Sequence, residues 1–450
     1  MPQRHVGIEL LTDWTAHPAA KWSFTREAPA AYASEPMQGR IPSRTKLMVT
    51  LFVAQVCGST GHSMSLAVGA IMAADIAGTN TVSGLPVAVG ALGAALASWP
   101  LARLMGRTGR RRGLGLGYGL AVIGAVISLL GAMIRSFPVM LAGMALFGIS
   151  NTSNLLARYA AADISPGPQR GRAMGIIVWG STLGSIIGPN LMPPALVVGV
   201  ALGVPASASA FLISVASFAL ATLLVEAFLR PDPLTIARGL EVAVSPGAVS
   251  ARPRRFGEAL GDVRVQIALA TLGIGQFVMI STTSTSPVYL HDSGHSVQVI
   301  GVAVSLHLAG MYVASPLSGW LSDRFGRIPT IVAGALLLIG AVVMAGLAPG
   351  SDRVLVILAL FLNGVGWNLG FVAGSALLTD ALTPGERASI QGFADLVLGA
   401  MGALGSTAGG MILGLWGFAI LNAVGAALVL APLAATLLRR TTVATSRPSG

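Results

Sequence analysis

Long apolar segments alternate with short polar ones along most of this chain. Twelve of the apolar segments approach the length of about 20 residues at which a helix spans a bilayer, and the loops between them hold most of the charged residues. The pattern predicts an all-α membrane protein with twelve transmembrane helices. The predicted helices are 47–72, 82–105, 113–134, 138–161, 173–195, 204–228, 265–290, 296–318, 329–347, 353–378, 388–412 and 416–438.

A polar stretch at 229–263 separates the sixth predicted helix from the seventh. It is rich in proline and arginine, so we expect a linker rather than a further span. The first 46 residues are also polar and lack the apolar core of a secretory signal. The predicted organisation is a cytoplasmic tail (1–46), a six-helix bundle (47–228), a cytoplasmic linker (229–263), a second six-helix bundle (264–438) and a cytoplasmic tail (439–450).

A repeat at a constant offset of 217 residues relates the two predicted bundles. The matching residues lie in five separate places and need no shift of register. Parallel six-helix repeats are an architecture of secondary transporters, in which the substrate site lies between the halves near the bilayer midplane. The matched pairs are Asp75 and Asp292, Arg107 and Arg324, Gly109 and Gly326, Arg110 and Arg327, Asn151 and Asn368, Asp163 and Asp380, Arg170 and Arg387, and Gly175 and Gly392.

The charged residues are few and unevenly placed. They make up 10% of the chain, against about 25% in a typical soluble domain, which favours lipid as the surrounding solvent. The net charge of +11 raises the alternative of a nucleic-acid partner, but the basic residues lie in short clusters between apolar segments, as juxtamembrane charges do. With the amino terminus inside, all of the 28 Lys and Arg residues except Arg135 and Arg353 fall on the cytoplasmic side. We therefore expect a multi-pass protein of the cell membrane with both termini in the cytoplasm, and no nucleic-acid partner.

Two loops at equivalent positions of the repeat carry a motif. The second loop reads GWLSDRFGR, from Gly319 to Arg327, and the first reads RLMGRTGRRR. They resemble the Gly-x-x-x-Asp-Arg-x-Gly-Arg signature of the major facilitator superfamily, which lies between helices 2 and 3 and is often repeated between helices 8 and 9. The resemblance covers 47–438, and it implies the major facilitator fold with two six-helix pseudo-repeats.

The resemblance also implies that the signature holds the halves together on the cytoplasmic side. In the family its Asp faces the amino terminus of a helix in the other half, where the helix dipole favours a negative charge. We therefore expect Asp323 to lie against the start of the fifth helix, whereas Gly106 replaces the Asp of the first copy and weakens the matching contact with the eleventh helix. An alternative is that the arginines only enforce topology. The expected gate residues are Arg107, Arg110, Arg111, Gly319, Asp323, Arg324, Gly326 and Arg327.

The fifth predicted helix contains a second element, GIIVWGSTLGSIIGPN. Gly180, Gly184 and Gly188 recur every four residues, so they share a face on which another helix can pack closely, and Pro189 can bend the helix. The element resembles the Gly-x-x-x-Gly-Pro motif of the antiporter branch of the superfamily, although Leu191 and the residue after it replace the usual trailing glycines. The resemblance favours an exporter and adds Gly188 and Pro189 to the gate; ordinary helix packing is the alternative.

Polar side chains inside membrane helices are costly, so they mark candidate functional sites. Asn151 and Asn154 share a face of the fourth helix, and Gln276 precedes a run of Ser and Thr on the seventh. In the superfamily pattern, helices 1, 4, 7 and 10 line the central cavity. Hydrogen bonding between or within helices is the alternative role. The candidate substrate-binding residues are Asn151, Asn154, Gln276, Asn363, Trp367 and Asn368.

Four residues are candidates for carrying a coupling proton. His62 and His307 fall near the middle of the first and eighth helices, and an imidazole can titrate near neutral pH. No acidic residue lies at mid-membrane; Asp75 is near the outer end of the first helix and Asp395 near the inner end of the eleventh. A hydrogen-bonded structural role is the alternative for the histidines.

The sequence thus predicts a secondary transporter that works by alternating access, with proton-coupled efflux of a small organic molecule as the favoured function. Facilitative uniport of a metabolite or sugar stays open because buried carboxylates are scarce. A transport-inactive sensor of the same fold stays open because the first signature is incomplete. No enzyme is predicted, and no cofactor or metal site. The expected partners are the substrate, protons and bilayer lipid, and a monomer is expected.

Overall fold

A computed structural model of this chain describes residues 44–78, 85–244 and 254–438. These residues form helices joined by short connections, and no β-strand occurs among them. The predicted terminal tails lie outside the described residues, apart from the first turn of the helix that begins at Arg44.

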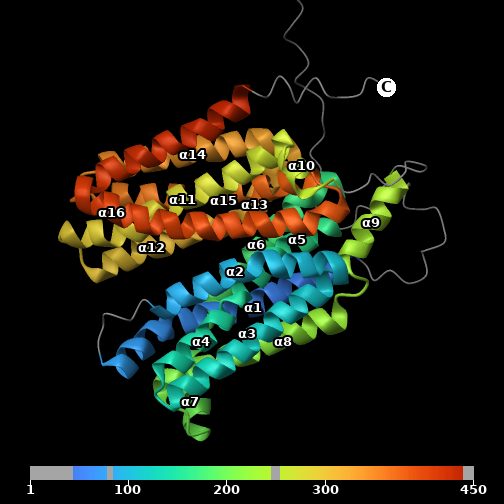
Figure 1. The fold of residues 1–450 in the computed structure, drawn as a ribbon. Helices are drawn as coiled ribbons and strands as arrows, with labels where there is room; N and C mark the ends of the chain where they lie inside the picture. Colours follow the sequence, from blue (N-terminus) through green and yellow to red (C-terminus); the bar gives the residue numbers. More distant parts are fainter. Residues whose placement is uncertain (1–43, 79–84, 245–253, 439–450) are drawn as a thin grey trace, which may run out of the picture. The chain divides into compact units, whose positions relative to one another are not determined.

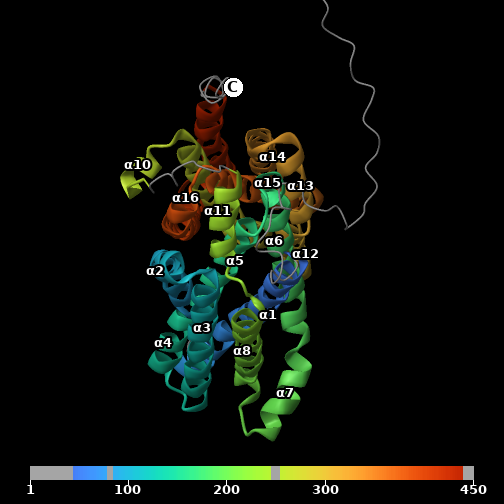
Figure 2. The ribbon, with the colours of Figure 1, turned by 90° about the vertical axis from the view of Figure 1, so that its right-hand side faces the viewer.

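The helices group into two bundles that follow the sequence repeat. Figures 1 and 2 show α1–α8 gathered in one bundle and α11–α16 in the other, with α5 and α6 beside the second bundle. The first bundle contains α1 (Arg44–Ala77), α2 (Leu85–Thr108), α3 (Arg110–Met133), α4 (Phe137–Phe147), α5 (Ile149–Asp163), α6 (Arg170–Asn190), α7 (Met192–Ala201) and α8 (Ala210–Phe228), with short 3-10 turns at Gly167–Gln169 and Ala206–Ala208.

The predicted linker is partly helical. It contains α9 (Pro233–Val244) and the short α10 (Phe256–Leu260). The second bundle then contains α11 (Val263–Asp292), α12 (Val297–Tyr312), α13 (Ser315–Phe325), α14 (Arg327–Leu347), α15 (Arg353–Asp380) and α16 (Pro384–Leu438).

Several predicted spans are interrupted rather than continuous. The fourth is divided at Gly148 into α4 and α5, and the eighth is divided into α12 and α13 just before Pro316. The fifth is bent by 50° between α6 and α7, next to Pro189, as the proline predicts. The last two predicted helices run on as α16, whose backbone leaves the helical region at Gly417 with φ 83° and ψ 173°.

The lengths and hydropathies of these helices suit a membrane. Among the described residues, nine helices are long and apolar enough to cross a bilayer, and the bent pair of α6 and α7 makes ten. The other two predicted segments coincide with α1 and with the part of α16 after Gly417. The chain is thus an all-helical, multi-pass membrane protein.

Small residues let the helices approach each other closely, as is usual in membrane proteins. A Cβ atom placed on Gly148 would lie 1.8 Å from the carbonyl oxygen of Gly90, and one placed on Gly310 would lie 2.4 Å from that of Phe361. No side chain fits at such distances, so glycine is required at these crossings.

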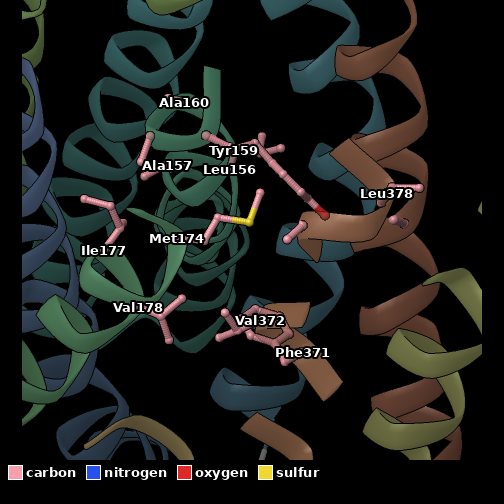
Figure 3. Close-up of a cluster of buried hydrophobic side chains, with 14 of the residues drawn as sticks. Leu156, Ala157, Tyr159, Ala160, Met174, Ile177, Val178, Phe371, Val372 and Leu378 are labelled. Carbon is pink, nitrogen blue, oxygen red and sulfur yellow. The ribbon is translucent and has the colours of Figure 1, made fainter. Parts of the chain in front are cut away.

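The two bundles meet through an apolar core that both supply. Val178 of α6 lies opposite Phe371 and Val372 of α15, and all three belong to one cluster of buried side chains (Figure 3). Two glycines that lie against the backbone of the opposite bundle extend this contact. A Cβ atom on Gly175 would lie 2.2 Å from the carbonyl oxygen of Ser315, and one on Gly319 would lie 2.3 Å from that of Gly171.

Candidate functional site

Gly109 and Gly326 place the two signature loops in the same conformation. Their φ angles are both 99°, and their ψ angles are 162° and 160°. This part of backbone space is open to glycine but strained for other residues. Each glycine directly precedes a helix that begins with arginine, Arg110 in α3 and Arg327 in α14. The repeat seen in the sequence is therefore also a repeat of backbone geometry.

Each of these arginines pairs with an aspartate at the end of a neighbouring helix. Arg110 Nε lies 2.8 Å from Asp163 Oδ2, and Arg327 Nε lies 3.0 Å from Asp380 Oδ2. The other bundle contributes a second arginine to each aspartate. Arg387 Nη1 lies 3.1 Å from Asp163 Oδ1, and Arg170 Nη1 lies 2.6 Å from Asp380 Oδ1. We call these the Asp163 cluster and the Asp380 cluster; each ties the two bundles together.

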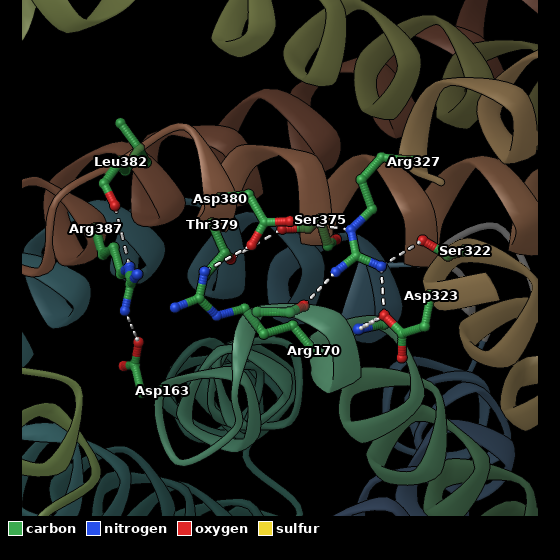
Figure 4. Close-up of polar contacts among 12 residues, drawn as sticks. Asp163, Arg170, Ser322, Asp323, Arg327, Ser375, Thr379, Asp380, Leu382 and Arg387 are labelled. Atoms are coloured by element: carbon green, nitrogen blue, oxygen red, sulfur yellow. Dashed lines mark hydrogen bonds and ion pairs between the residues drawn. The ribbon is translucent and has the colours of Figure 1, made fainter. Parts of the chain in front are cut away.

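Asp323 of the second signature lies at the start of α6, as the sequence predicts. Its Oδ1 accepts a hydrogen bond from the backbone N–H of Gly171 at 2.9 Å, and its Oδ2 accepts one from that of Arg172 at 2.7 Å (Figure 4). Arg327 pairs with the same carboxylate and also donates to the carbonyl oxygen of Gly167 at 2.7 Å. A carboxylate in this position satisfies N–H groups that a helix leaves unpaired, and it is favoured by the helix dipole.

Gly106 of the first signature has no side chain that could make such a contact. A Cβ atom on Gly106 would lie 3.0 Å from the Cβ of Ala388, which is the repeat counterpart of Gly171. Gly106 and Ala388 therefore stand where the second signature has an aspartate and a glycine. Arg107 is exposed, as is its counterpart Arg324.

Asp232, which the sequence analysis missed, serves the first signature instead. Its two carboxylate oxygens accept hydrogen bonds from the backbone N–H groups of Arg110, at 3.0 Å, and Arg111, at 2.8 Å. The Arg111 side chain pairs with Glu226 at 2.8 Å. The sequence did contain a signal for this role. Asp232 lies between two prolines shortly after the sixth predicted helix, and short acidic side chains commonly cap the starts of helices.

The glycine face of α6 packs against α1. A Cβ atom on Gly184 would lie 2.5 Å from the Cβ of Ser59, and one on Gly188 would lie 2.3 Å from Ser63 Oγ. The spacing of four residues thus predicts the contact face correctly. Its part in the transport cycle stays a prediction.

The structure corrects the pairing of Asn151 with Asn368. The Asn368 amide nitrogen donates to the carbonyl oxygen of Met311 at 2.6 Å, but the carbonyl of Ala94, the counterpart of Met311, accepts from Thr152 at 2.7 Å. Thr152, rather than Asn151, is therefore the structural counterpart of Asn368. The two residues are 216 positions apart, not 217. Asn151 is only partly buried.

The shift lies between these contacts and the two clustered aspartates. From Thr152 to Asp163 is a step of 11 residues, whereas from Asn368 to Asp380 is a step of 12. The glycine contacts between helices show the same shift. Gly148 contacts Gly90, and Gly364 contacts His307. Gly148 and Gly364 are 216 residues apart, whereas Gly90 and His307 are 217 residues apart.

Two of the candidate substrate amides are occupied within their own bundle. Asn154 Oδ1 accepts a hydrogen bond from the Tyr118 hydroxyl at 2.9 Å. Asn368 contacts Ser318 Oγ at 2.6 Å and Ser315 Oγ at 2.7 Å, in addition to Met311. These contacts favour the alternative role of holding helices together.

The remaining candidates lie on α11 and α15. The Trp367 indole N–H donates to Gln276 Oε1 at 2.9 Å, and its ring stacks on Phe371 with centroids 4.6 Å apart. Asn363 is buried, and neither polar atom of its amide has a hydrogen-bond partner among the described residues. The hydroxyls that follow Gln276 largely bond back to their own helix; Thr285 Oγ1, for example, donates to the carbonyl oxygen of Ser281 at 2.7 Å.

Three of the proton-coupling candidates have, among the described residues, hydrogen-bond or ion-pair partners from one bundle only. His62 Nδ1 lies 3.0 Å from Ser150 Oγ. His307 is held through both ring nitrogens, by Thr283 Oγ1 at 3.1 Å and the carbonyl oxygen of Leu360 at 2.9 Å. Asp75 pairs with Arg135 at 3.0 Å, and both side chains are more than half exposed. Asp395 alone among the four pairs with a residue of the other bundle, Arg158.

Comparison with known protein families agrees with this architecture. The family model described as Major Facilitator Superfamily matches residues 51–297 and 267–450. The uncharacterized MFS-type transporter YddS of Bacillus subtilis is 33% identical over 391 residues, which cover 86% of this chain and 88% of that protein. The riboflavin transporter RfnT of Brucella anthropi is 28% identical over 396 residues, covering 86% and 94%. A chloramphenicol resistance protein of Streptomyces lividans is 29% identical over 289 residues, covering 63% and 67%.

Solved structures share the fold. The human organic anion transporter MFSD10 superposes with a TM-score of 0.69 at 17% identity, over 88% of this chain and 100% of that chain. At this identity the likeness concerns the fold alone.

Proposed function

This chain belongs to the Major Facilitator Superfamily, and on that premise we propose that it is a secondary active transporter that exports a small organic molecule by alternating access, driven by protons. The observation that carries the proposal is the mirrored pair of clusters at Asp163 and Asp380, in which each aspartate is held by an arginine of the other bundle. A cavity between the bundles can open on that side only if these pairs separate. A fold built from two such halves transports by rocking one against the other.

Two observations support export. The glycine face and the bend of α6 match the antiporter-type element, and resistance to chloramphenicol is the named role of one relative. The named role of another relative is riboflavin transport, so both molecules are suitable first probes.

The proposal also includes an orientation, with the signatures and both termini in the cytoplasm. It rests on the basic residues, which concentrate on the signature side. We expect a cysteine at Ser351 to react with an impermeant thiol reagent in sealed cells, and a cysteine at Thr108 not to react. Both are exposed hydroxyl residues, Thr108 at the end of α2 and Ser351 in the connection between α14 and α15, so they form a matched pair in a Cys57→Ala background. Reaction at Thr108 alone would contradict the orientation.

Transport is tested with purified protein in liposomes. A screen of drugs and metabolites for ligands that raise the Tm selects the substrate, with chloramphenicol and riboflavin included. We expect a pH gradient to drive accumulation of that substrate against its concentration gradient. Equilibration without accumulation would instead identify the uniporter, and binding without flux would identify the sensor.

A further inference from the structure

Arg158 of α5 and Asp395 of α16 form an ion pair between the two bundles. Arg158 Nη2 lies 2.5 Å from Asp395 Oδ1, and the two side chains are 1% and 0% exposed. Removing such a pair from water is costly unless both partners are well satisfied. Its retention inside the protein therefore calls for an explanation.

The two partners are satisfied unequally. Arg158 Nε donates to Ser375 Oγ at 3.1 Å, and Nη2 donates to the Tyr159 hydroxyl at 3.0 Å. Its guanidinium also lies 4.5 Å from the centre of the Phe371 ring. By contrast, Asp395 Oδ2 is buried and has no hydrogen-bond partner among the described residues. A proton added at this oxygen would give a neutral acid, which costs less to bury than an ion.

This pair has no counterpart in the repeat. At offsets of 217 and 216 residues, Arg158 corresponds to Ser375 and Gly374, and Asp395 corresponds to Val178. The Asp163 and Asp380 clusters, in contrast, repeat residue by residue. The Arg158–Asp395 pair is therefore an addition to the ion pairs that the two halves share.

The pair also lies deeper than the clusters. Asp395 is eleven residues beyond Pro384, where α16 begins, which places it about 16 Å along the helix axis. Asp163, at the end of α5, is five residues beyond Arg158.

Few ionisable groups surround Asp395. Arg158 and Tyr159 approach it from α5, and Arg110 of α3 is the next charge. The ionisable residues on the long helices packed against α16 lie toward the ends of those helices: Arg103 and Arg107 on α2, Arg264, Tyr289, His291 and Asp292 on α11, Arg327 on α14, and Arg353 and Asp380 on α15. The linker helices that contact α16 add Arg238 on α9 and Glu258 on α10.

Coupling requires a group whose proton affinity differs between the two states of the transporter. Within the part of the chain that the structure describes, the hydrogen-bond partners of His62 and His307 come from one bundle only, so rocking leaves those partners in place. The partners of Asp395 and Arg158 come from both bundles, so separation of the bundles necessarily breaks their pair.

We propose that Asp395 carries the coupling proton and that Arg158 is its positioning counter-charge. This inference rests on the proposed proton-driven transport. With the signature side closed, a proton binds Asp395 at the oxygen that Arg158 leaves free, and the ion pair becomes a neutral acid beside a cation. The bundles can then part, and the proton leaves Asp395 for the cytoplasm, where substrate is loaded. Closure of the bundles re-forms the pair.

The test compares pH-driven accumulation with substrate exchange in the same liposomes. For one proton per substrate, a gradient of one pH unit supports about tenfold accumulation. In Asp395→Asn, which keeps the hydrogen-bonding shape but cannot titrate, we expect exchange to persist and the accumulation ratio to fall to about one. Asp292→Asn, which removes an exposed acid, should accumulate like the wild type.

A second readout separates coupling from a structural role. Addition of substrate to weakly buffered, purified wild type should release protons, and Asp395→Asn should release none. Asp395→Glu should restore release, and Arg158→Gln should move the pH midpoint of exchange upward, because it removes a cation beside the carboxylate.

The outcomes distinguish the two proposals. A wild type without any response to pH would overturn proton coupling and this inference with it. Accumulation and proton release that persist in Asp395→Asn but disappear in the double variant His62→Gln, His307→Gln would overturn the inference alone.

Discussion

The Asp163 and Asp380 clusters contain the same ion pairs in different surroundings. Arg110 and Asp163 are both 0% exposed, whereas Arg327 and Asp380 are 12% and 28% exposed. The Asp380 cluster is joined by Asp323, which binds the start of α6 across the bundles. The Asp163 cluster is joined by Gln391, which accepts from Arg110, and by Asp232 of the linker.

This difference shows how one gate can be built from unequal halves. The second half relies on a carboxylate at a helix start of the opposite bundle, which any rocking motion must break. The first half relies on the buried Asp163 cluster, which Arg387 and Gln391 of the other bundle also hold, and on a linker residue on the same side as α3. Opening therefore breaks contacts in both halves, but a signature carboxylate bound to a helix start is found in the second half.

The largest expected effect comes from changing the two aspartates separately. Asp163→Asn leaves Arg110 and Arg387 buried without a counter-charge, and breaking a buried pair costs about 3–5 kcal/mol. Asp380→Asn should cost about 1 kcal/mol, because its carboxylate and partners are partly solvated. We expect a much lower Tm for Asp163→Asn in a common detergent, with Asp292→Asn as the control. Equal Tm losses would refute the difference in burial as the cause.

The next effect concerns transport rather than stability. Asp323→Asn removes a negative charge from the start of α6, which we expect to weaken closure by about 1–2 kcal/mol, or about fivefold to thirtyfold in the gate equilibrium. Transport should fall accordingly while membrane insertion stays normal, and Gly106→Asp should impair transport less. Flux and surface expression measured together test this order. Wild-type transport in both variants would remove the gating role of Asp323.

A smaller effect is expected at the linker. Asp232→Ala removes acceptors for the N–H groups of Arg110 and Arg111, and loss of a helix cap costs about 1 kcal/mol. Asp232→Asn keeps one amide oxygen and should lose less. The Tm of each variant measures this directly. A Tm unchanged in both would show that water replaces the carboxylate without loss.

The smallest effect is expected from substitutions that make the first signature like the second. Gly106→Asp alone places a side chain against the Ala388 methyl group, at a Cβ separation of 3.0 Å. With Ala388→Gly added, the aspartate can reach the start of α16 and contribute about 0.5 kcal/mol. The double variant should therefore be more stable than Gly106→Asp, with Ala388→Gly alone as the control. A double variant less stable than both single variants would contradict this geometry.

The sequence by itself determined the twelve apolar segments and the repeat, which depend on hydrophobic length and on residue identity at a constant spacing. The contact of Asp323 with the start of α6 was an expectation that the resemblance of its motif to the family signature implied. The glycine face of α6 was predictable from the sequence, because a spacing of four residues decides which side chains share a helix face.

Only the tertiary structure decided how the repeat is broken. The one-residue shift between Thr152 and Asn368 is invisible to a constant offset, because compensating differences within helices leave Asp163 and Asp380 aligned. The break at Gly417 was obscured by neighbouring glycines, all of which permit a turn.

The partners of buried polar residues were likewise decided by the tertiary structure. Arg158 and Asp395 are separated by 237 residues, and nothing in either neighbourhood identifies the other as its counter-charge. The same holds for Asn154 with Tyr118 and for Asp232 with the start of α3. A polar residue in an apolar helix must find a partner, but which one it finds depends on how the helices cross.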